Sequence, residues 1–379
     1  MFNEINKKEK KLQLTPNDLR LKERLCLLYK KTYNKQKALE CYVDLLNSGL
    51  NTKSVNKHLG DLYLDLEKYQ DALDHYIKID TEDIKNLKML HNLVKIYDKL
   101  KNKKELINTY GFIVELDPSN LKALFNLIRL NLNAQNKFPA AKALYQYLLQ
   151  KQFDFKEYQE LIKKFKGLKK MLPEMIFDNF DNFKDANKVT LFNFARILLA
   201  NNLPTKSRIV FKTIFADQDT EDKLKAASLY KEFNFLEEAA KLYEGILEKE
   251  PENTDVLFEL AYLNYCINNT ESALAYADKL YEIDSDNLEV LMVMGEILTQ
   301  KGSYQEAFDV VNKAESIDLL RKDIMRLKLK IMKKLKKNRP ELAKDIKEYE
   351  KAVKNKTNKH DKEDVNSQCK KQKSWYDFN

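Results

Sequence analysis

Residues 288–321 read LEVLMVMGEILTQKGSYQEAFDVVNKAESIDLLR and contain two amphipathic segments. Gly302 and Ser303 separate them. The apolar positions of both segments recur at the three- and four-residue steps of a helix face: Leu291, Met294, Gly295 and Leu298, then Tyr304, Ala307, Val311 and Ala314. Neither helix can bury its apolar stripe alone, so the stretch predicts a helical hairpin that stacks on similar neighbours.

An alanine in the second helix marks the neighbours along the chain. Successive marker alanines lie 34 residues apart from Ala38 to Ala72, from Ala239 to Ala273 and from Ala273 to Ala307. Small or medium-sized residues keep the same step in the first helix: Cys26, Gly60, Val94, Ile128, Ala227, Ala261 and Gly295. Small side chains let two helix backbones approach closely, so these positions are predicted to be core.

A helix–turn–helix unit of this length with these markers resembles the tetratricopeptide repeat. The resemblance implies an all-α, right-handed superhelical solenoid of about nine repeats with a C-terminal cap and a concave groove. It also implies a platform that binds other proteins, while the fold alone names no ligand.

The repeat step divides the chain into six segments. Residues 155–187 keep the helical period but lose the alanine, which predicts a degenerate repeat and a bend, with Pro173 opening its second helix. Asn17 or Asp18 is expected to cap a helix that begins at Leu19. The segments are a frayed polar lead-in over 1–18, an N-terminal repeat block over 19–154, the degenerate repeat over 155–187, a C-terminal repeat block over 188–321, capping helices over 322–353 and a disordered tail over 354–379.

Composition narrows the function classes. The chain has only 7 Gly and 7 Pro, too few for the many turns of a β-sandwich or for a glycine-rich phosphate loop. Its four histidines show no metal-ligand spacing, and no catalytic motif is present, so we expect neither an enzyme nor a cofactor or metal site. The first residues contain no apolar signal segment, and we expect a cytoplasmic protein without an integral membrane segment.

Cysteine usage points to the same compartment. The four cysteines form no CxxC pair, and Cys26 and Cys266 fall in apolar helical patterns, where a free thiol acts as a small hydrophobe. A reducing compartment with free thiols is therefore the simplest expectation.

The net charge of +9 belongs to one end of the chain. Residues 320–379 hold 20 Lys or Arg and 9 Asp or Glu, so the remaining 319 residues are close to neutral. Ten basic residues lie within 321–339. This run predicts either a capping helix whose lysines reach solvent or a segment that binds RNA or an anionic membrane.

The groove-facing positions of the first helices are the candidate binding site. In the N-terminal block they are mostly basic and suit an extended acidic segment: Lys57, Asp61, Lys88, His91, Asn92, Lys95, Lys122, Asn126 and Arg129. In the C-terminal block they are aromatic and acidic and suit an apolar or helical segment: Phe258, Glu259, Tyr262, Tyr265, Met292, Glu296 and Thr299. A solvated face without a dedicated ligand is the alternative.

Chaperone-binding members of the family that the chain resembles clamp a C-terminal carboxylate with five residues. Lys57, Asn92 and Lys122 match that pattern here, but Asp61 and Asn126 do not. Asp61 would repel a carboxylate and Asn126 cannot hold one with two hydrogen bonds, so this clamp is not expected.

The sequence therefore predicts a non-catalytic scaffold or adaptor that helps assemble a larger complex. Its alternatives are an RNA- or membrane-associated adaptor that uses residues 321–339, and a regulatory subunit of an enzyme. The final SWYDFN contains three aromatic residues, Trp375, Tyr376 and Phe378. This aromatic cluster suggests a short docking motif, for a partner or for the chain's own groove. The partner's identity and the oligomeric state stay open.

Overall fold

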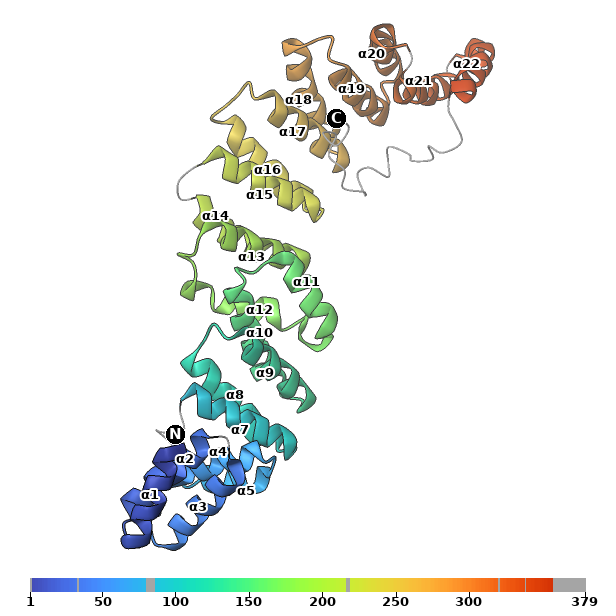
Figure 1. Ribbon diagram of the computed structural model, residues 1–379. Coiled ribbons are helices and arrows are strands. Elements are labelled where there is room, and N and C mark those ends of the chain that lie inside the picture. The colour runs from blue at the N-terminus through green and yellow to red at the C-terminus, as the bar shows by residue number, and fades with distance from the viewer. Residues whose placement is uncertain are drawn as a thin grey trace. The chain divides into compact units, whose positions relative to one another are not determined.

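The computed structural model describes residues 2–32, 34–79, 86–215, 219–319, 321–337 and 339–356. These residues form helices without strands, and the predicted all-α repeat solenoid is confirmed (Figure 1). The chain divides into two compact units, Met1–Asn179 and Phe180–Asn379. We call them unit 1 and unit 2 and describe each by itself.

Unit 1 contains four helical hairpins between a leading helix and an irregular end. Its elements are α1 (Phe2–Leu14), α2 (Leu19–Lys31), α3 (Lys35–Asn47), α4 (Lys53–Asp65), α5 (Tyr69–Tyr76), α7 (Leu87–Lys99), α8 (Lys103–Leu116), α9 (Leu121–Asn133), α10 (Lys137–Gln150), α11 (Phe155–Lys164), the 3₁₀ turn η1 (Lys166–Leu168) and α12 (Leu172–Asp178). The hairpins among the described residues are α2–α3, α4–α5, α7–α8 and α9–α10.

Unit 2 repeats the pattern with four more hairpins and two further helices. Its elements are η2 (Phe180–Asn182), α13 (Lys188–Ala200), α14 (Pro204–Ile214), α15 (Thr220–Glu232), α16 (Leu236–Leu247), α17 (Thr254–Cys266), α18 (Thr270–Ile283), α19 (Leu288–Lys301), α20 (Tyr304–Ile317), α21 (Lys322–Leu335), η4 (Pro340–Leu342) and α22 (Ala343–Lys356). The stretch 288–321 forms the hairpin α19–α20, as predicted.

The marker residues lie where the two helices of a hairpin cross. The marker alanines Ala38, Ala72 and Ala307 are fully buried. A β-carbon added at Gly60 would lie 2.8 Å from the Tyr76 ring, and one added at Gly295 would lie 2.6 Å from Val311. The small residues therefore set the close approach of the helices, as the sequence predicted.

Each core cluster spans more than one hairpin. In one cluster, Leu291 of α19 packs with Val311 of α20 and with Ile324 and Leu327 of α21. Another joins α17 and α18 to Val293 and Ile297 of α19. A hairpin is thus stable only beside its neighbours, which is the energetic basis of a solenoid.

Helix starts and turns repeat with the hairpins. The Asp18 carboxylate accepts the Leu21 backbone N–H at 3.0 Å, which confirms the predicted cap of the helix beginning at Leu19. The turn between the two helices of a hairpin places one residue at positive φ, in the left-handed region of backbone conformation. The residues at this position are Glu67, Lys101, Gln135, Asn202, Asn234, Asn268 and Gly302. A left-handed residue reverses the chain after a helix, so the same turn recurs although only one of these residues is glycine.

The frayed lead-in expected over residues 1–18 is wrong for residues 2–14, which form α1. Ile5 is buried against Leu25 and Leu28 of α2, and the Tyr29 hydroxyl bonds to Glu9. The Lys-rich composition obscured one apolar side of this helix, which packing on α2 buries.

Residues 155–187 are the most irregular part of the array. α11 has 10 residues and α12 only 7, with a 3₁₀ turn between them. Pro173 lies in the first turn of α12, as predicted, because a proline there lacks only an N–H that has no intrahelical partner. The boundary between the two units falls within this stretch, and the bend stays a prediction.

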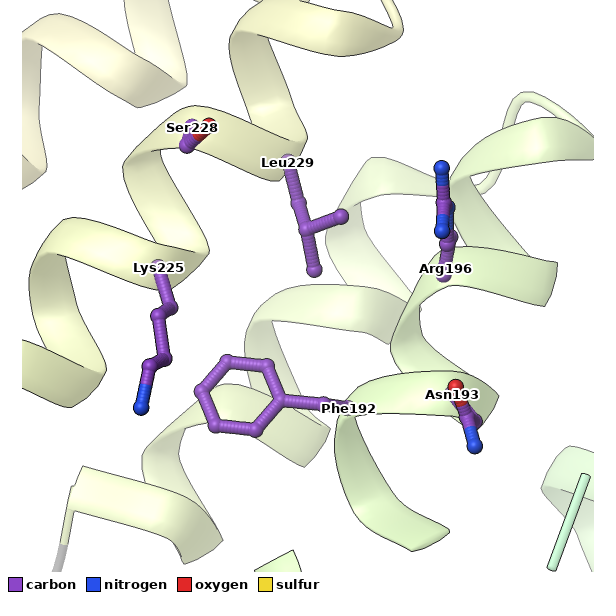
Figure 2. A pocket seen from close by; sticks show the side chains of 6 residues that line it. All are labelled: Phe192, Asn193, Arg196, Lys225, Ser228 and Leu229. Atoms are coloured by element: carbon purple, nitrogen blue, oxygen red, sulfur yellow. The ribbon is translucent and has the colours of Figure 1, made fainter. Parts of the chain in front are cut away.

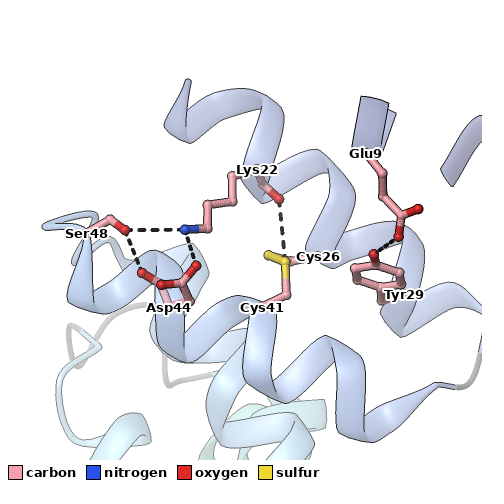
Figure 3. Close-up of a disulfide and its surroundings, with 7 residues drawn as sticks. All are labelled: Glu9, Lys22, Cys26, Tyr29, Cys41, Asp44 and Ser48. Atoms are coloured by element: carbon pink, nitrogen blue, oxygen red, sulfur yellow. Dashed lines mark hydrogen bonds and ion pairs between the residues drawn. A yellow bond between two sulfur atoms is a disulfide. The ribbon is translucent and has the colours of Figure 1, made fainter. Parts of the chain in front are cut away.

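The expectation of free, unbridged thiols at Cys26 and Cys266 is also wrong, because both residues are disulfide-bonded. Cys26 and Cys41 form a disulfide that joins α2 to α3 (Figure 3). Lys22 pairs with Asp44 beside it and also lies 3.4 Å from the Ser48 hydroxyl (Figure 3). The two cysteines are 15 residues apart, and only the hairpin brings their side chains together.

Substitution of Gly295 tests the close approach. Gly295→Ala should lower the melting temperature, because the new methyl group would meet Val311 at 2.6 Å and overpacking costs about 1–3 kcal/mol. Gly245→Ala in α16 is the matched control, since no atom lies within 4 Å of that position. It should raise stability by about 0.5–1 kcal/mol through helix propensity. Thermal denaturation that moved in the same direction for both variants would contradict this explanation.

Removal of the disulfide tests its contribution to unit 1. The double variant Cys26→Ala with Cys41→Ala should lose about 3 kcal/mol, because a 15-residue loop is no longer closed in the unfolded chain. A reducing agent should lower the melting temperature of the wild type more than that of the variant. Equal shifts in both proteins would show that this disulfide does not stabilise the fold.

Candidate binding surfaces

The first helices of successive hairpins form one continuous side of each unit, which we call the first-helix face. In unit 1 it is lined by α2, α4, α7 and α9, and in unit 2 by α13, α15, α17 and α19, followed by α21. The residues predicted to bind a partner all lie on these helices.

The first-helix face of unit 1 is basic and accessible. Asn92 and Asn126 are half-buried. The exposed residues on this face are Lys57, Lys88, His91, Lys95, Lys122 and Arg129. Five of these six carry a positive charge at neutral pH, so this part of unit 1 favours an acidic segment.

A polar network lies behind these cations. The Asp61 carboxylate accepts hydrogen bonds from Lys30 Nζ at 2.8 Å and from the Tyr76 hydroxyl at 2.6 Å. Asn92 donates to the same tyrosine oxygen at 3.0 Å, and Lys30 Nζ lies 3.1 Å from His58 Nδ1. The network joins α2, α4, α5 and α7 through side chains.

Burial and charge shift the titration of this network. Burial, with the hydrogen bond to Asp61, raises the pKa of Tyr76 well above its ordinary value. Burial and the neighbouring Lys30 lower the pKa of His58. The Asp61 charge is balanced by Lys30, so its repulsion of a carboxylate ligand is weaker than the sequence suggested. The Asn92 amide is at the same time held by Tyr76, and the five-residue clamp is still not expected.

A hollow of about 310 Å³ lies on the first-helix face of unit 2 between α13 and α15 (Figure 2). The Phe192 ring extends from α13 toward Lys225 and Leu229 of α15, with Arg196 and Asn193 on the other side (Figure 2). Arg196 also pairs with Glu232, and Lys225 pairs with Glu221 at 2.6 Å. An aromatic surface beside two cations suits a side chain that carries apolar and acidic groups.

This hollow was not predicted from the sequence. Lys225 and Ser228 lie 34 residues before Glu259 and Tyr262, both of which were predicted to line the groove. Extending the same repeat register to α13 and α15 would have found them. The register is hidden at α13, because the step from α13 to α15 is shorter than the step from α15 to α17.

The predicted groove residues of α17 and α19 differ in exposure. Phe258, Tyr262 and Tyr265 are half-buried, whereas Met292 and Glu296 are 3% and 9% exposed. Glu259 pairs with Lys231 at 2.6 Å. Glu296 accepts from Lys330 at 2.9 Å and from the Tyr265 hydroxyl at 3.3 Å. Thr299 donates to the Gly295 carbonyl at 2.6 Å. This face is thus aromatic but close to neutral, because each glutamate has a lysine partner.

The basic run 321–339 makes many intramolecular ion pairs. Arg321 pairs with Glu289 and Asp323, and three lysines of α21 pair with glutamates of neighbouring helices. These pairs are Lys328–Glu315, Lys330–Glu296 and Lys333–Glu350, at 2.5, 2.9 and 2.8 Å. They favour the capping role of α21, and an RNA or membrane role for this run stays a prediction.

Within the described residues, no helix is both long and apolar enough to cross a membrane. The same part of the chain shows no cluster of His, Cys, Asp or Glu side chains that could hold a metal ion. The proposed docking motif, Trp375, Tyr376 and Phe378, lies outside the residues that the structure describes.

Comparison with known proteins finds a family match over part of the chain. Residues 224–287 match the family model of the tetratricopeptide repeat. This part of the chain contains tetratricopeptide repeats. In the structure the matched residues form α15, α16, α17 and α18, two consecutive hairpins of unit 2.

Three solved structures match this chain at TM-scores below 0.5. MamA from MSR-1 is 16% identical over 45% of this chain and 98% of its own, with a TM-score of 0.36. A complex of Naa15 and Naa10 bound to HypK is 14% identical over 87% of this chain and 63% of the matched one, with a TM-score of 0.34. A tetratricopeptide repeat protein from Parabacteroides merdae is 14% identical over 83% and 98%, with a TM-score of 0.29. No curated protein matches the sequence.

Substitution of Asp61 tests the polar network of unit 1. Asp61→Ala should lower the free energy of unfolding by about 1–3 kcal/mol, because Lys30 and Tyr76 lose a partly buried partner. Asp65→Ala, one turn later in α4, removes a half-exposed pair with Lys35 at 3.5 Å and should change stability by less than about 0.5 kcal/mol. Urea denaturation of both variants measures the difference. Equal small losses would mean that the network does not hold the hairpins together.

Proposed function

We propose that this protein is a non-catalytic scaffold that binds segments of other proteins on its first-helix faces and helps assemble a larger complex. The proposal is supported by the exposed cations of α4, α7 and α9, which lie along one side of three successive hairpins. A row of this kind follows the direction in which an extended peptide would run.

The chemistry of the ligand follows from the charges. In unit 2 the groove glutamates are neutralised by lysines, while in unit 1 the lysines Lys88, Lys95 and Lys122 reach solvent. An acidic segment would therefore gain charge-assisted hydrogen bonds in unit 1. Unit 2 would select apolar and aromatic side chains instead.

A cytoplasmic location is part of the proposal. The disulfide between Cys26 and Cys41 bears on this location, because reducing compartments usually keep cysteine thiols reduced and unbridged. Quantifying the oxidised fraction of this pair in protein isolated under acid quench would decide between a reducing and an oxidising compartment.

Peptide binding tests the function in unit 1. A fluorescein-labelled peptide of eight glutamates should bind the wild-type chain in a fluorescence anisotropy titration, and its affinity should fall as salt is raised. Lys88→Glu with Lys95→Glu should weaken binding by roughly tenfold or more, because two favourable contacts become repulsive.

The matched control reverses two charges on the second helix of another hairpin in the same unit. Lys137→Glu with Lys142→Glu changes two exposed lysines of α10 and should leave the affinity nearly unchanged. Equal losses in both double variants would indicate a general effect of net charge. Equal losses, or no salt-dependent binding by the wild type, would contradict the proposed site.

A further inference from the structure

Three successive first helices of unit 2 present side chains at equivalent positions. On each helix three positions are separated by four and then three residues, and we call each set of three a row. Each row lies 34 residues after the previous one. The rows are Phe258, Tyr262 and Tyr265 on α17, then Met292, Glu296 and Thr299 on α19, then Arg326, Lys330 and Lys333 on α21. The Tyr265 hydroxyl and Lys330 Nζ both bond to Glu296, so the three rows adjoin one another.

The chemistry changes in order across these rows. The α17 row is aromatic and half-buried. The α19 row is buried, and it is neutral because its one carboxylate is bonded to Lys330. The α21 row is basic, and the side chains of Lys330 and Lys333 stay 45% and 53% exposed although each pairs with a glutamate. A lysine ammonium has three donors, so an exposed one can bind a second carboxylate.

A suitable occupant would therefore carry aromatic rings next to an acidic group. We propose that residues 374–378 of this same chain, Ser-Trp-Tyr-Asp-Phe, bind across the three rows. Trp375, Tyr376 and Phe378 contact the aromatic row, and Asp377 faces the cations of α21. This inference rests on the proposed function, because it assigns an occupant to a first-helix face. A bound C-terminal segment would compete with a partner for the first-helix face of unit 2.

The linker is long enough for this arrangement. α22 ends at Lys356, 19 residues before Trp375, and an extended chain of that length reaches about 60 Å. α22, α21, α19 and α17 are successive neighbours, and packed helices lie about 8–10 Å apart, so the distance to be spanned is about 30 Å. Tethering also gives the segment an effective concentration near the millimolar range, so a weak interaction suffices.

The only tryptophan of the chain makes the inference directly measurable. Trp375 fluorescence in the full chain should be shifted to the blue and quenched several-fold less by acrylamide than in the free peptide KQKSWYDFN, which comprises residues 371–379. Tyr262→Ala should restore the peptide-like signal by removing part of the aromatic row. Asp377→Lys should do the same without altering the solenoid, so the test does not depend on the folding of one variant.

Phe138→Ala is the control, because this ring is 65% exposed on α10 of unit 1 and should leave the Trp375 signal unchanged. Trp375 behaving in the wild type as it does in the peptide would overturn the inference. Protection that survives either substitution, or that grows with protein concentration and so reports a second copy, would also overturn it. The readout uses no partner, so its failure is distinct from failure of acidic-peptide binding in unit 1.

Discussion

The close crossing of two helices at a small side chain is the constraint on which the rest of the structure depends. Gly295 has Val311 so near that a β-carbon would not fit, and Gly60 is in the same position against Tyr76. Packing density in protein interiors leaves no room for a larger residue at these two crossings. The crossing fixes which side of each helix is core, and the opposite side of the first helices then becomes the surface available for binding.

That surface is shaped by contacts between neighbouring hairpins as much as by its own residues. Lys30 with Asp61, Lys231 with Glu259 and Lys330 with Glu296 each join two successive first helices. A charged side chain on this face can therefore already be paired with a charge on a neighbouring helix, which leaves it less available to a ligand. The cations of α7 and α9 remain exposed, which distinguishes the basic face of unit 1 from the nearly neutral face of unit 2.

Different helices adjoin the first and the last hairpin of the array. α1 covers the first hairpin with Ile5, and α21 and α22 follow the last hairpin. An end hairpin would otherwise expose the apolar side that its neighbour buries elsewhere. The lysines of α21 combine this role with solubility, because Lys328 pairs with Glu315 while Leu327 and Ile331 of the same helix are buried.

The sequence by itself determined the repeat, the hairpin boundaries, the cap at Asp18 and the buried marker residues. Each depends on residues a few positions apart, whose geometry a helix fixes. Only the tertiary structure decided that Asp61 is neutralised by Lys30, that Cys26 bonds to Cys41, that α1 packs on α2, and that Phe192 and Lys225 line one hollow. These contacts join separate helices, and their partners depend on side-chain reach and on the exact placement of one helix against another, which a linear period does not contain.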